Sequence, residues 1–463
     1  MSTLITRPYQ SLLVIFVSWK ALLLLFAVFT PGSAYDTSTT LLEVNRNASN
    51  LDRNGPLMII LSLITTKLTR WDAIYFTEAA RRGYTFEQEW AFSYSFSGLI
   101  RTFTNALRRT ADIDYPLLES SVGIAIAHVA HCISVFVLYS LARAVFPKKQ
   151  DRKLAFLAAC LHIFSPAGLF MSAPYAESTH ALFSFVGSLL FVLSFSQSGA
   201  SSGLQDASIP LSGVMYGLAT IVRSNGILNG ILFFEEAVRL LYSMTKSVTF
   251  AKTRRLLAVG IAGVCTALGF VIPQYIAYGQ FCMNNKDPRI WCLRSIPSIY
   301  SFVQDHYWDN GFLRYWTLSN VPLFALAGPM LAIMTYSAYW TLSVNSNRQK
   351  KGIAQAHPEL RLTGRLLRSL AAPQMTLAIL TFLKHHVQII TRMSSGYPVW
   401  YLWLAYILIE GSSLASSGKV GVRLDKKAAS ILNQYRYARM TVAYMIIYAA
   451  VQGVLFASFL PPA

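Results

Sequence analysis

Carboxylate and aromatic side chains gather in one stretch, residues 67–97, of a chain that is otherwise poor in acids. Its acids are Asp72, Glu78, Glu87 and Glu89, and its aromatic residues include Trp71, Tyr75, Tyr84 and Trp90. Ionised carboxylates are strongly disfavoured in hydrocarbon, so this stretch must lie in water or in a polar cavity at a membrane surface. Aromatic rings beside carboxylates suit sugars, because the C–H faces of a sugar stack on the ring while the acids accept hydrogen bonds from its hydroxyls. An interfacial segment with an aromatic belt explains the same residues about equally well.

The overall composition is that of an integral membrane protein. The chain has 463 residues, of which 54% are hydrophobic and only 13% are charged, and its mean hydropathy is +0.42. Several apolar runs reach the roughly 17 to 25 residues that cross a bilayer as a helix, and the alternating pattern of a membrane barrel is absent from the sequence. We therefore expect an all-α polytopic membrane protein that forms a single domain over residues 1–463.

The net charge of +19 comes from basic residues concentrated in the connections between apolar runs. This placement is typical of cytoplasmic loops and fits them better than it fits a nucleic-acid-binding face. We therefore expect a membrane setting and no nucleic acid partner. The alternation of basic connections with acidic and aromatic ones predicts roughly 8 to 11 membrane helices, with the acidic and aromatic loops on the lumenal side.

Two large lumenal loops follow from this topology, residues 31–118 and residues 279–317. The first apolar run, residues 11–29, ends near small residues that resemble a signal-peptidase site, but its length favours a retained helix. Asn47 begins a glycosylation sequon in the first loop, as expected on that side. Residues 57–68 are too short to cross the membrane and predict an interfacial or re-entrant helix.

Arg223 interrupts the apolar stretch 211–242 and is followed by Ser224-Asn225-Gly226. This pattern predicts two short helices broken at the arginine, whose charge and free backbone polar groups satisfy one another or a ligand inside the protein. A packing ion pair between Arg223 and a buried acid is the alternative. It is less favoured, because intramembrane arginines are rarely without function.

The five cysteines are too few for a disulfide scaffold, and none of them has the spacing of metal ligands, so we expect no metal site. Cys282 and Cys292 share a polar loop and could form a disulfide if that loop faces an oxidising lumen. Free thiols are equally compatible with the sequence, because pairing depends on geometry.

The second large loop contains a further aromatic and polar cluster, with His306, Trp308 and Asp309. By alternation it faces the same side as the first cluster. A transferase that uses a lipid-linked sugar needs a carboxylate base, cations for the phosphate and aromatic sugar platforms at this interface, and all three are available. A transporter would be expected to place its polar residues near mid-membrane, often with repeat symmetry.

Five sequence blocks resemble, in order, those of the GPI mannosyltransferase 2 family, which adds the second mannose to glycosylphosphatidylinositol precursors. The first block is Arg70-Trp71-Asp72 with Gly83-Tyr84, Glu87 and Ala91-Phe92. The others are Ser165-Pro166-Ala167 with residues 172–178, Arg223-Ser224-Asn225-Gly226, Tyr307-Trp308 with Gly311-Phe312-Leu313 and Tyr315-Trp316, and Arg392-Met393-Ser394-Ser395 before Pro398. The sequence departs from the family at Ser93-Tyr94-Ser95, where a Phe-Pro turn is expected, which leaves the direction of Glu87 open.

The resemblance implies a GT-C type glycosyltransferase in the endoplasmic reticulum membrane with lumenal catalytic loops. It implies dolichyl phosphate mannose as donor, a GPI precursor with one mannose as acceptor, an α1,6 linkage and no cofactor. Asp72 would then be the catalytic base of a single inverting displacement. Asp309 is a rival for this role, because it belongs to a second Trp-Asp pair.

The resemblance also suggests roles for other residues of the two clusters. Arg223 and Arg392, with His306 as a weaker candidate, would bind the donor phosphate. The candidates for sugar or acceptor binding are Trp71, Tyr84, Glu87, Glu177, Trp308 and, if it is not the base, Asp309. For each of these residues, loop packing is the competing interpretation.

Three other functions are compatible with the same sequence. They are a GT-C mannosyltransferase for another lipid-linked or protein acceptor, a lipid or sugar transporter, and a non-catalytic assembly subunit. The sequence leaves open whether a small membrane subunit is a partner.

Overall fold

The computed structural model describes residues 2–30, 38, 56–92, 94–111, 117–195, 202–283, 288–349, 358–416 and 426–460, and this part of the chain is helical without a strand. The α-helices are α1 (Ser2–Thr6), α2 (Pro8–Phe29), α4 (Pro56–Leu68), α5 (Asp72–Arg82), α6 (Tyr94–Ala111), α7 (Leu118–Val145), α8 (Arg152–Ile163), α9 (Glu177–Leu193), α10 (Ser202–Val222), α11 (Gly230–Met244), α12 (Phe250–Tyr278), α13 (Ile299–His306), α14 (Val321–Gln349), α16 (Pro358–Lys384), α17 (Ile390–Met393), α18 (Val399–Ser416) and α19 (Lys426–Ala457). The all-α prediction is confirmed.

Six described helical segments are long and apolar enough to cross a membrane, which confirms a multi-pass protein. They are Pro8–Phe29, Leu118–Val145, Phe250–Met283, Leu318–Leu342, Arg361–Lys384 and Ser430–Ala457. This number is below the expected 8 to 11, because several helices of the bundle are short. Helices α8 and α11 have 12 and 15 residues, and α9 has 17, at the lower limit for a span.

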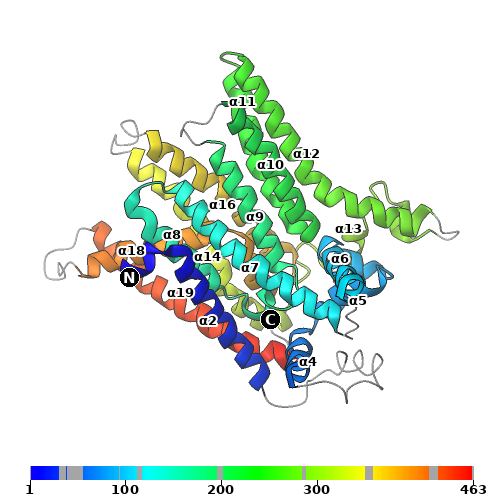
Figure 1. The fold of residues 1–463 in the computed structure, drawn as a ribbon. Helices are drawn as coiled ribbons and strands as arrows, with labels where there is room; N and C mark the ends of the chain where they lie inside the picture. The colour runs from blue at the N-terminus through cyan, green and yellow to red at the C-terminus, as the bar shows by residue number, and fades with distance from the viewer. Residues whose placement is uncertain are drawn as a thin grey trace.

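The helices form two groups at opposite ends of the molecule, with a middle layer between them. Helices α10, α11 and α12 extend together to one end, whereas α2 and α19, from opposite ends of the sequence, lie side by side at the other (Figure 1). Helices α7, α8, α9 and α18 lie between them (Figure 1). The buried side chains of this middle layer include Trp400, Tyr401 and Phe185, so it forms the core.

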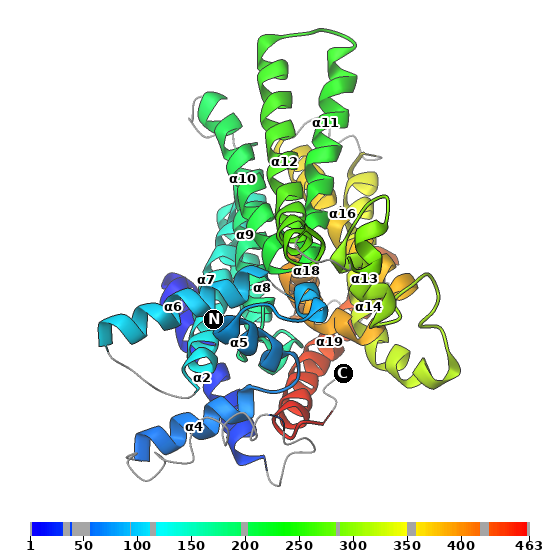
Figure 2. The same ribbon diagram turned by 90° about the vertical axis from the view of Figure 1, so that its right-hand side faces the viewer.

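Helices α4, α5 and α6 lie together at one side of the molecule (Figure 2). They come from the predicted first lumenal loop, and α4 corresponds to the short helix expected at residues 57–68. The sequon at Asn47 lies outside the described residues. The 3-10 helix η2 (Glu87–Ala91), which follows α5, contacts α13 of the second large loop, so the two predicted lumenal loops meet.

The apolar stretch around Arg223 is broken as predicted. Helix α10 ends at Val222, Arg223 has an extended backbone, and the 3-10 helix η5 (Ser224–Asn229) leads into α11. Gly226 is required at this break, because a Cβ atom there would lie 2.6 Å from the backbone nitrogen of Thr220. The break therefore brings Arg223 and Asn225 into the interior.

Small residues allow α10 and α12 to pack backbone against backbone. A Cβ atom on Gly213 would lie 2.3 Å from the Cα atom of Ala262, and one on Gly217 would lie 2.5 Å from the carbonyl oxygen of Cys265. Gly213 and Gly217 are one helical turn apart, which is the spacing of close-packed membrane helices.

Cys282 and Cys292 form a disulfide, with their Cα atoms 5.7 Å apart. The bond joins the end of the segment that continues α12 to the 3-10 helix η7 (Ile290–Leu293). The pairing that the sequence left open is thus present in the structure. It ties down the start of the second large loop.

Candidate functional site

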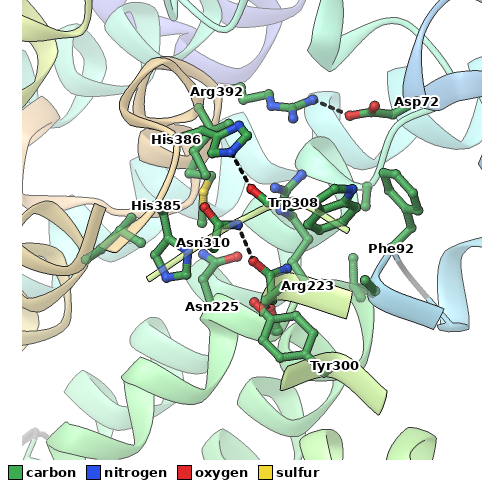
Figure 3. Close-up of a pocket in the computed structure, with 18 of the residues that line it drawn as sticks. Asp72, Phe92, Arg223, Asn225, Tyr300, Trp308, Asn310, His385, His386 and Arg392 are labelled. Atoms are coloured by element: carbon green, nitrogen blue, oxygen red, sulfur yellow. Dashed lines mark hydrogen bonds and ion pairs between the residues drawn. The ribbon is translucent and has the colours of Figure 1, made fainter. Parts of the chain in front are cut away.

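A cavity of about 570 Å³ opens where the two predicted lumenal loops meet the ends of the bundle helices. Its wall is built from α5, η2, η5, α12, α13, α16, α17 and the turn before α9. Ten of its lining residues are labelled in Figure 3. One acid, Asp72, two arginines and several aromatic rings reach this cavity. The rest of its wall combines polar side chains with apolar ones such as Phe270, Leu377 and Leu380.

Asp72 is the first residue of α5 and faces the cavity. The turn before it is strained, because Trp71 has a positive φ of 56°, a conformation that bulky residues rarely adopt. The Trp71 ring packs against Phe459, with the ring centroids 5.2 Å apart, which holds the turn in place. A carboxylate at a helix N-terminus is also stabilised by the helix dipole.

Arg392 donates a hydrogen bond from Nη1 to Oδ2 of Asp72 at 2.8 Å (Figure 3). Its guanidinium lies over the rings of Phe170 and Tyr175, at 5.1 and 5.8 Å from their centroids. Burial disfavours the charge of Arg392, but the carboxylates of Asp72 and Glu177 outweigh burial and raise the pKa of Arg392 above its ordinary value. Arg392 is therefore a fixed cation in the wall of the cavity.

Glu177 lies behind the cavity and joins two arginines. Its Oε1 atom accepts a hydrogen bond from Arg223 and lies 3.8 Å from Nε of Arg392. The four side chains form a row of alternating charge, Asp72, Arg392, Glu177 and Arg223, which we call the charge row. The row brings together residues from four separate parts of the sequence.

Three aromatic rings form a further part of the cavity wall, which we call the aromatic wall. Phe92 stacks on Tyr75 with the ring centroids 4.8 Å apart, and its edge meets Trp308 at 5.3 Å. All three rings line the cavity. They offer faces on which a sugar ring can stack.

Two adjacent histidines complete the side of the cavity near Trp308 (Figure 3). The ring of His386 contacts the carbonyl oxygen of Trp308 through Nε2 at 2.9 Å. Burial, together with the charge of Lys384 and the neighbouring His386, lowers the pKa of His385 to about 4. His385 is therefore neutral at neutral pH and can serve as a hydrogen-bonding group rather than as a cation.

Polar groups from η5 and α13 line the other end of the cavity. The Ser224 hydroxyl donates a hydrogen bond to the Tyr300 oxygen at 2.9 Å. The side chain of Asn225 donates to Tyr397 and contacts His180, each at 3.2 Å. The break at Arg223 thus supplies an ordered polar surface to the cavity.

The structure brings several predicted site residues together and separates others. Asp72, Arg223, Arg392 and Trp308 line the cavity, with Glu177 directly behind the two arginines. Trp71 does not line it but packs beside Asp72.

Four predicted residues lie away from the cavity wall. Tyr84 packs between Trp90 and Tyr94 in an aromatic cluster, and exposed His306 stacks on Phe302. Asp309 has a side chain that is 83% exposed and pairs with Arg314.

Glu87, the fourth of these residues, connects the two loops. It accepts hydrogen bonds from the indole N–H of Trp291 at 2.9 Å and from the hydroxyl of Tyr307 at 3.2 Å. Arg289 also lies 3.6 Å away. We call this contact the Glu87 brace; it fixes η2, which carries Gln88 into the cavity wall.

Sequence reasoning did not single out Tyr75, Phe92, His385 and His386 as site residues. The two histidines end an apolar run shortly before Arg392, and such a polar pair at a helix end is a signal that could have found them. Among the described residues, no group of three or more His, Cys, Asp or Glu side chains could hold a metal ion.

The arrangement suits transfer of a sugar from a phosphate. A carboxylate can accept a proton, the two arginines can stabilise negative charge that develops on a leaving phosphate, and the aromatic wall can bind a sugar ring.

Comparison with known proteins gives a consistent result over the whole chain. Residues 9–463 match the family described as Mannosyltransferase (PIG-V). GPI mannosyltransferase 2 of Gibberella zeae is 41% identical, over 99% of this chain and 98% of its own length. The proteins of the same name from Chaetomium globosum and Yarrowia lipolytica are 42% and 30% identical, over 99% of this chain and 97% and 100% of their own lengths.

The matches among solved structures are more distant. The oligosaccharyltransferase of Archaeoglobus fulgidus in the apo form has a TM-score of 0.43 at 15% identity and covers 86% of this chain and 55% of its own. ArnT from Cupriavidus metallidurans bound to undecaprenyl phosphate has a TM-score of 0.42 at 11% identity and covers 96% of this chain and 76% of its own.

Proposed function

Because the chain belongs to the GPI mannosyltransferase 2 family and is therefore a mannosyltransferase of GPI-anchor biosynthesis, we propose the donor, linkage and base of its reaction. The donor is dolichyl phosphate mannose, and the acceptor is a GPI precursor with one mannose. The product linkage is α1,6, and Asp72 is the base. The fold is of the GT-C type, and the reaction takes place at the lumenal face of the endoplasmic reticulum membrane.

The observation that carries this proposal is the Asp72–Arg392 pair in the wall of the cavity. Arg392 contacts Oδ2 of Asp72, which leaves the other carboxylate oxygen for a hydroxyl of the acceptor. The acceptor oxygen forms a bond to C1 of the donor mannose as its proton passes to Asp72. The bond between C1 and the phosphate oxygen breaks, and dolichyl phosphate leaves with the electron pair.

During this step one unit of negative charge disappears from Asp72 and one appears on the leaving phosphate. Arg392 is placed to stabilise both, because its guanidinium can donate to two anions at once. Arg223, 18% exposed at the cavity, supplies a second cation for the phosphate. No covalent intermediate is required, since a single inverting displacement converts a β-linked donor to an α-linked product.

Two observations support the lumenal side for this cavity. The Cys282–Cys292 disulfide lies in the loop that carries Trp308, and disulfides persist in oxidising compartments. The basic segment 246–255 lies at the opposite end of α12, as the positive-inside rule requires of a cytoplasmic connection.

The test is transfer of radiolabelled mannose from dolichyl phosphate mannose to a GPI precursor with one mannose. Microsomes would carry wild type, Asp72→Asn or Asp309→Asn at matched abundance. We expect Asp72→Asn to lower the rate by about 100-fold or more, because the amide keeps the shape of the acid but cannot take the proton. Asp309→Asn should keep the wild-type rate, since this residue lies outside the cavity wall.

Retained transfer by Asp72→Asn would refute the assignment of the base. If wild type transfers mannose to a truncated lipid-linked N-glycan precursor instead of the GPI precursor, the acceptor assignment is wrong.

A further inference from the structure

We propose that Glu177 is a positioning residue for the donor: its carboxylate holds Arg223 and Arg392 so that both guanidinium groups face the phosphate of a prenyl-linked sugar. This inference rests on the proposed function and refines it. It also gives Glu177 a role other than binding acceptor hydroxyls.

The burial of Glu177 argues against direct contact with a substrate. Its side chain is 0% exposed, whereas those of Arg223 and Arg392 are 18% and 19% exposed and line the cavity. A ligand in the cavity therefore meets the arginines and does not reach the glutamate. The neighbouring backbone is fixed as well, because the Ser178 hydroxyl donates to the carbonyl oxygen of Met171 at 3.0 Å.

Glu177 approaches the two arginines from behind. Arg392 directs Nη1 toward Asp72 and Nε toward Glu177, so its planar guanidinium is held from two sides. Arg223 comes from the break between α10 and η5 and has its charged partner in Glu177. Without the glutamate, Asp72 would be the one remaining acid paired with Arg392, and Arg223 would lose the ion pair that sets its direction.

The carboxylate also sets the charge of the site. The charge row contains two acids and two arginines, so it is neutral before a donor binds. Two unpaired guanidinium groups would be costly to bury together, and each would shift toward water. Glu177 lets the protein keep two cations at the cavity wall without a phosphate present.

The proposed reaction places two requirements on the position of Arg392. The same guanidinium has to pair with Asp72 before transfer and stabilise the leaving phosphate during it. A buried anchor at Nε restricts the group to positions from which both anions are within reach. Loss of that anchor should therefore weaken binding of the donor and slow transfer, while the acceptor binds as before.

A matched control exists at the opposite end of the bundle. Glu236 is likewise buried between two arginines, Arg255 and Arg365, but none of the three lines the cavity. Glu236→Gln breaks the same kind of buried ion pair as Glu177→Gln. It therefore reports the effect on folding that any such substitution has.

The experiment compares full-length wild type, Glu177→Gln, Glu177→Asp and Glu236→Gln in microsomes, with rates divided by protein abundance. The KM for dolichyl phosphate mannose, the KM for the GPI precursor and inhibition by added dolichyl phosphate are measured for each. For Glu177→Gln we expect the donor KM to rise by about tenfold or more and inhibition by dolichyl phosphate to weaken similarly. The acceptor KM should stay within about twofold, and Glu177→Asp should recover part of the donor affinity.

Glu236→Gln should show unchanged KM values even if its abundance falls. The proposal is overturned if Glu177→Gln loses abundance alone, with normal donor KM and inhibition. It is also overturned if only the acceptor KM rises, which would make Glu177 part of the acceptor site. Retained transfer by Asp72→Asn, combined with a raised donor KM in Glu177→Gln, would refute the base assignment and leave the positioning role standing.

Discussion

The two carboxylates of the charge row differ in their access to the cavity. Asp72 has a side chain that is 28% exposed and faces the cavity, whereas Glu177 is fully buried. A proton acceptor must lie within hydrogen-bonding reach of the substrate hydroxyl, and of the two only Asp72 lines the cavity. Burial therefore separates a residue suited to chemistry from one suited to holding the arginines.

Sequence reasoning found the charged residues of the site and missed most of its aromatic wall. Asp72 and Arg223 are conspicuous, because ionised groups in an apolar chain need a special environment, whereas Arg392 was named through the resemblance to the family. Tyr75 and Phe92 carry no such signal, since aromatic residues are common at any membrane interface. Their role depends on the stacking that the folded loops create.

The half-buried histidine His385 makes a pH-dependent contribution to stability. Its pKa is lowered to about 4 in the folded protein, against an ordinary value near 6.5, so the unfolded chain binds the proton more tightly. Stability should then fall as the pH drops from about 6.5 toward 4. At pH 5 this histidine should make the free energy of unfolding about 1–2 kcal/mol lower than it is at neutral pH.

Thermal unfolding of detergent-purified wild type and His385→Gln at pH 7 and pH 5 would measure this contribution. We expect the drop in Tm on acidification to be smaller for the variant, because glutamine does not titrate. An identical drop in both proteins would contradict the prediction.

At the scale of elements, the break after α10 and the short helix α4 were predictable from local sequence. The first follows from a charge inside an apolar run, and the second follows from a run too short to cross. The Glu87 brace was not predictable, because it joins residues of two loops that are about 200 positions apart in the sequence. The missing Phe-Pro turn left the direction of Glu87 open, and the structure directs it toward Trp291 rather than into the cavity.

The close packing of α10 on α12 predicts a strict size limit at Gly217. A side chain there would collide with the carbonyl oxygen of Cys265, so Gly217→Leu should push the two helices apart and displace η5 with Arg223. We expect a several-fold loss of folded protein and of transfer.

The matched control is Gly260→Leu, because nothing lies within 4 Å of a Cβ atom at that position of α12. For both variants, protein abundance is measured by immunoblot and mannose transfer is measured in microsomes. Equal abundance and equal transfer in Gly217→Leu and Gly260→Leu would show that the contact between α10 and α12 does not limit stability.

At the scale of the whole molecule, the charge and the disulfide are the basis on which we propose that the two ends of the bundle face different compartments. The basic segment before α12 lies at one end, and the disulfide-tied loop after it lies at the other. The positive-inside rule and the disulfide point to the same orientation, although they rest on different physics. The orientation that we propose from them would put the cavity on the lumenal side.

Cysteine labelling in sealed microsomes, whose cytoplasmic face is outward, would test the orientation. Val248 and Phe312 are 71% and 72% exposed. Val248 precedes α12 in the sequence, and Phe312 lies in the loop that follows it. Val248→Cys should react with a membrane-impermeant maleimide in intact microsomes, and Phe312→Cys should react only after detergent is added. The reverse pattern would invert the topology, and wild type gives the background from the native thiols.

The contact between Trp71 and Phe459 has a consequence for biogenesis. Phe459 is buried and also lies under the guanidinium of Arg70, 5.0 Å from the ring centroid, so the turn that follows α19 supports the strained turn before Asp72. A ribosome delivers the chain from its N-terminus, and Arg70-Trp71-Asp72 therefore enters the membrane long before its support exists. The turn before Asp72 is therefore synthesised early and gains this support only once α19 has followed, so a chain that stalls before α19 would contain the proposed base without the contact that holds its turn.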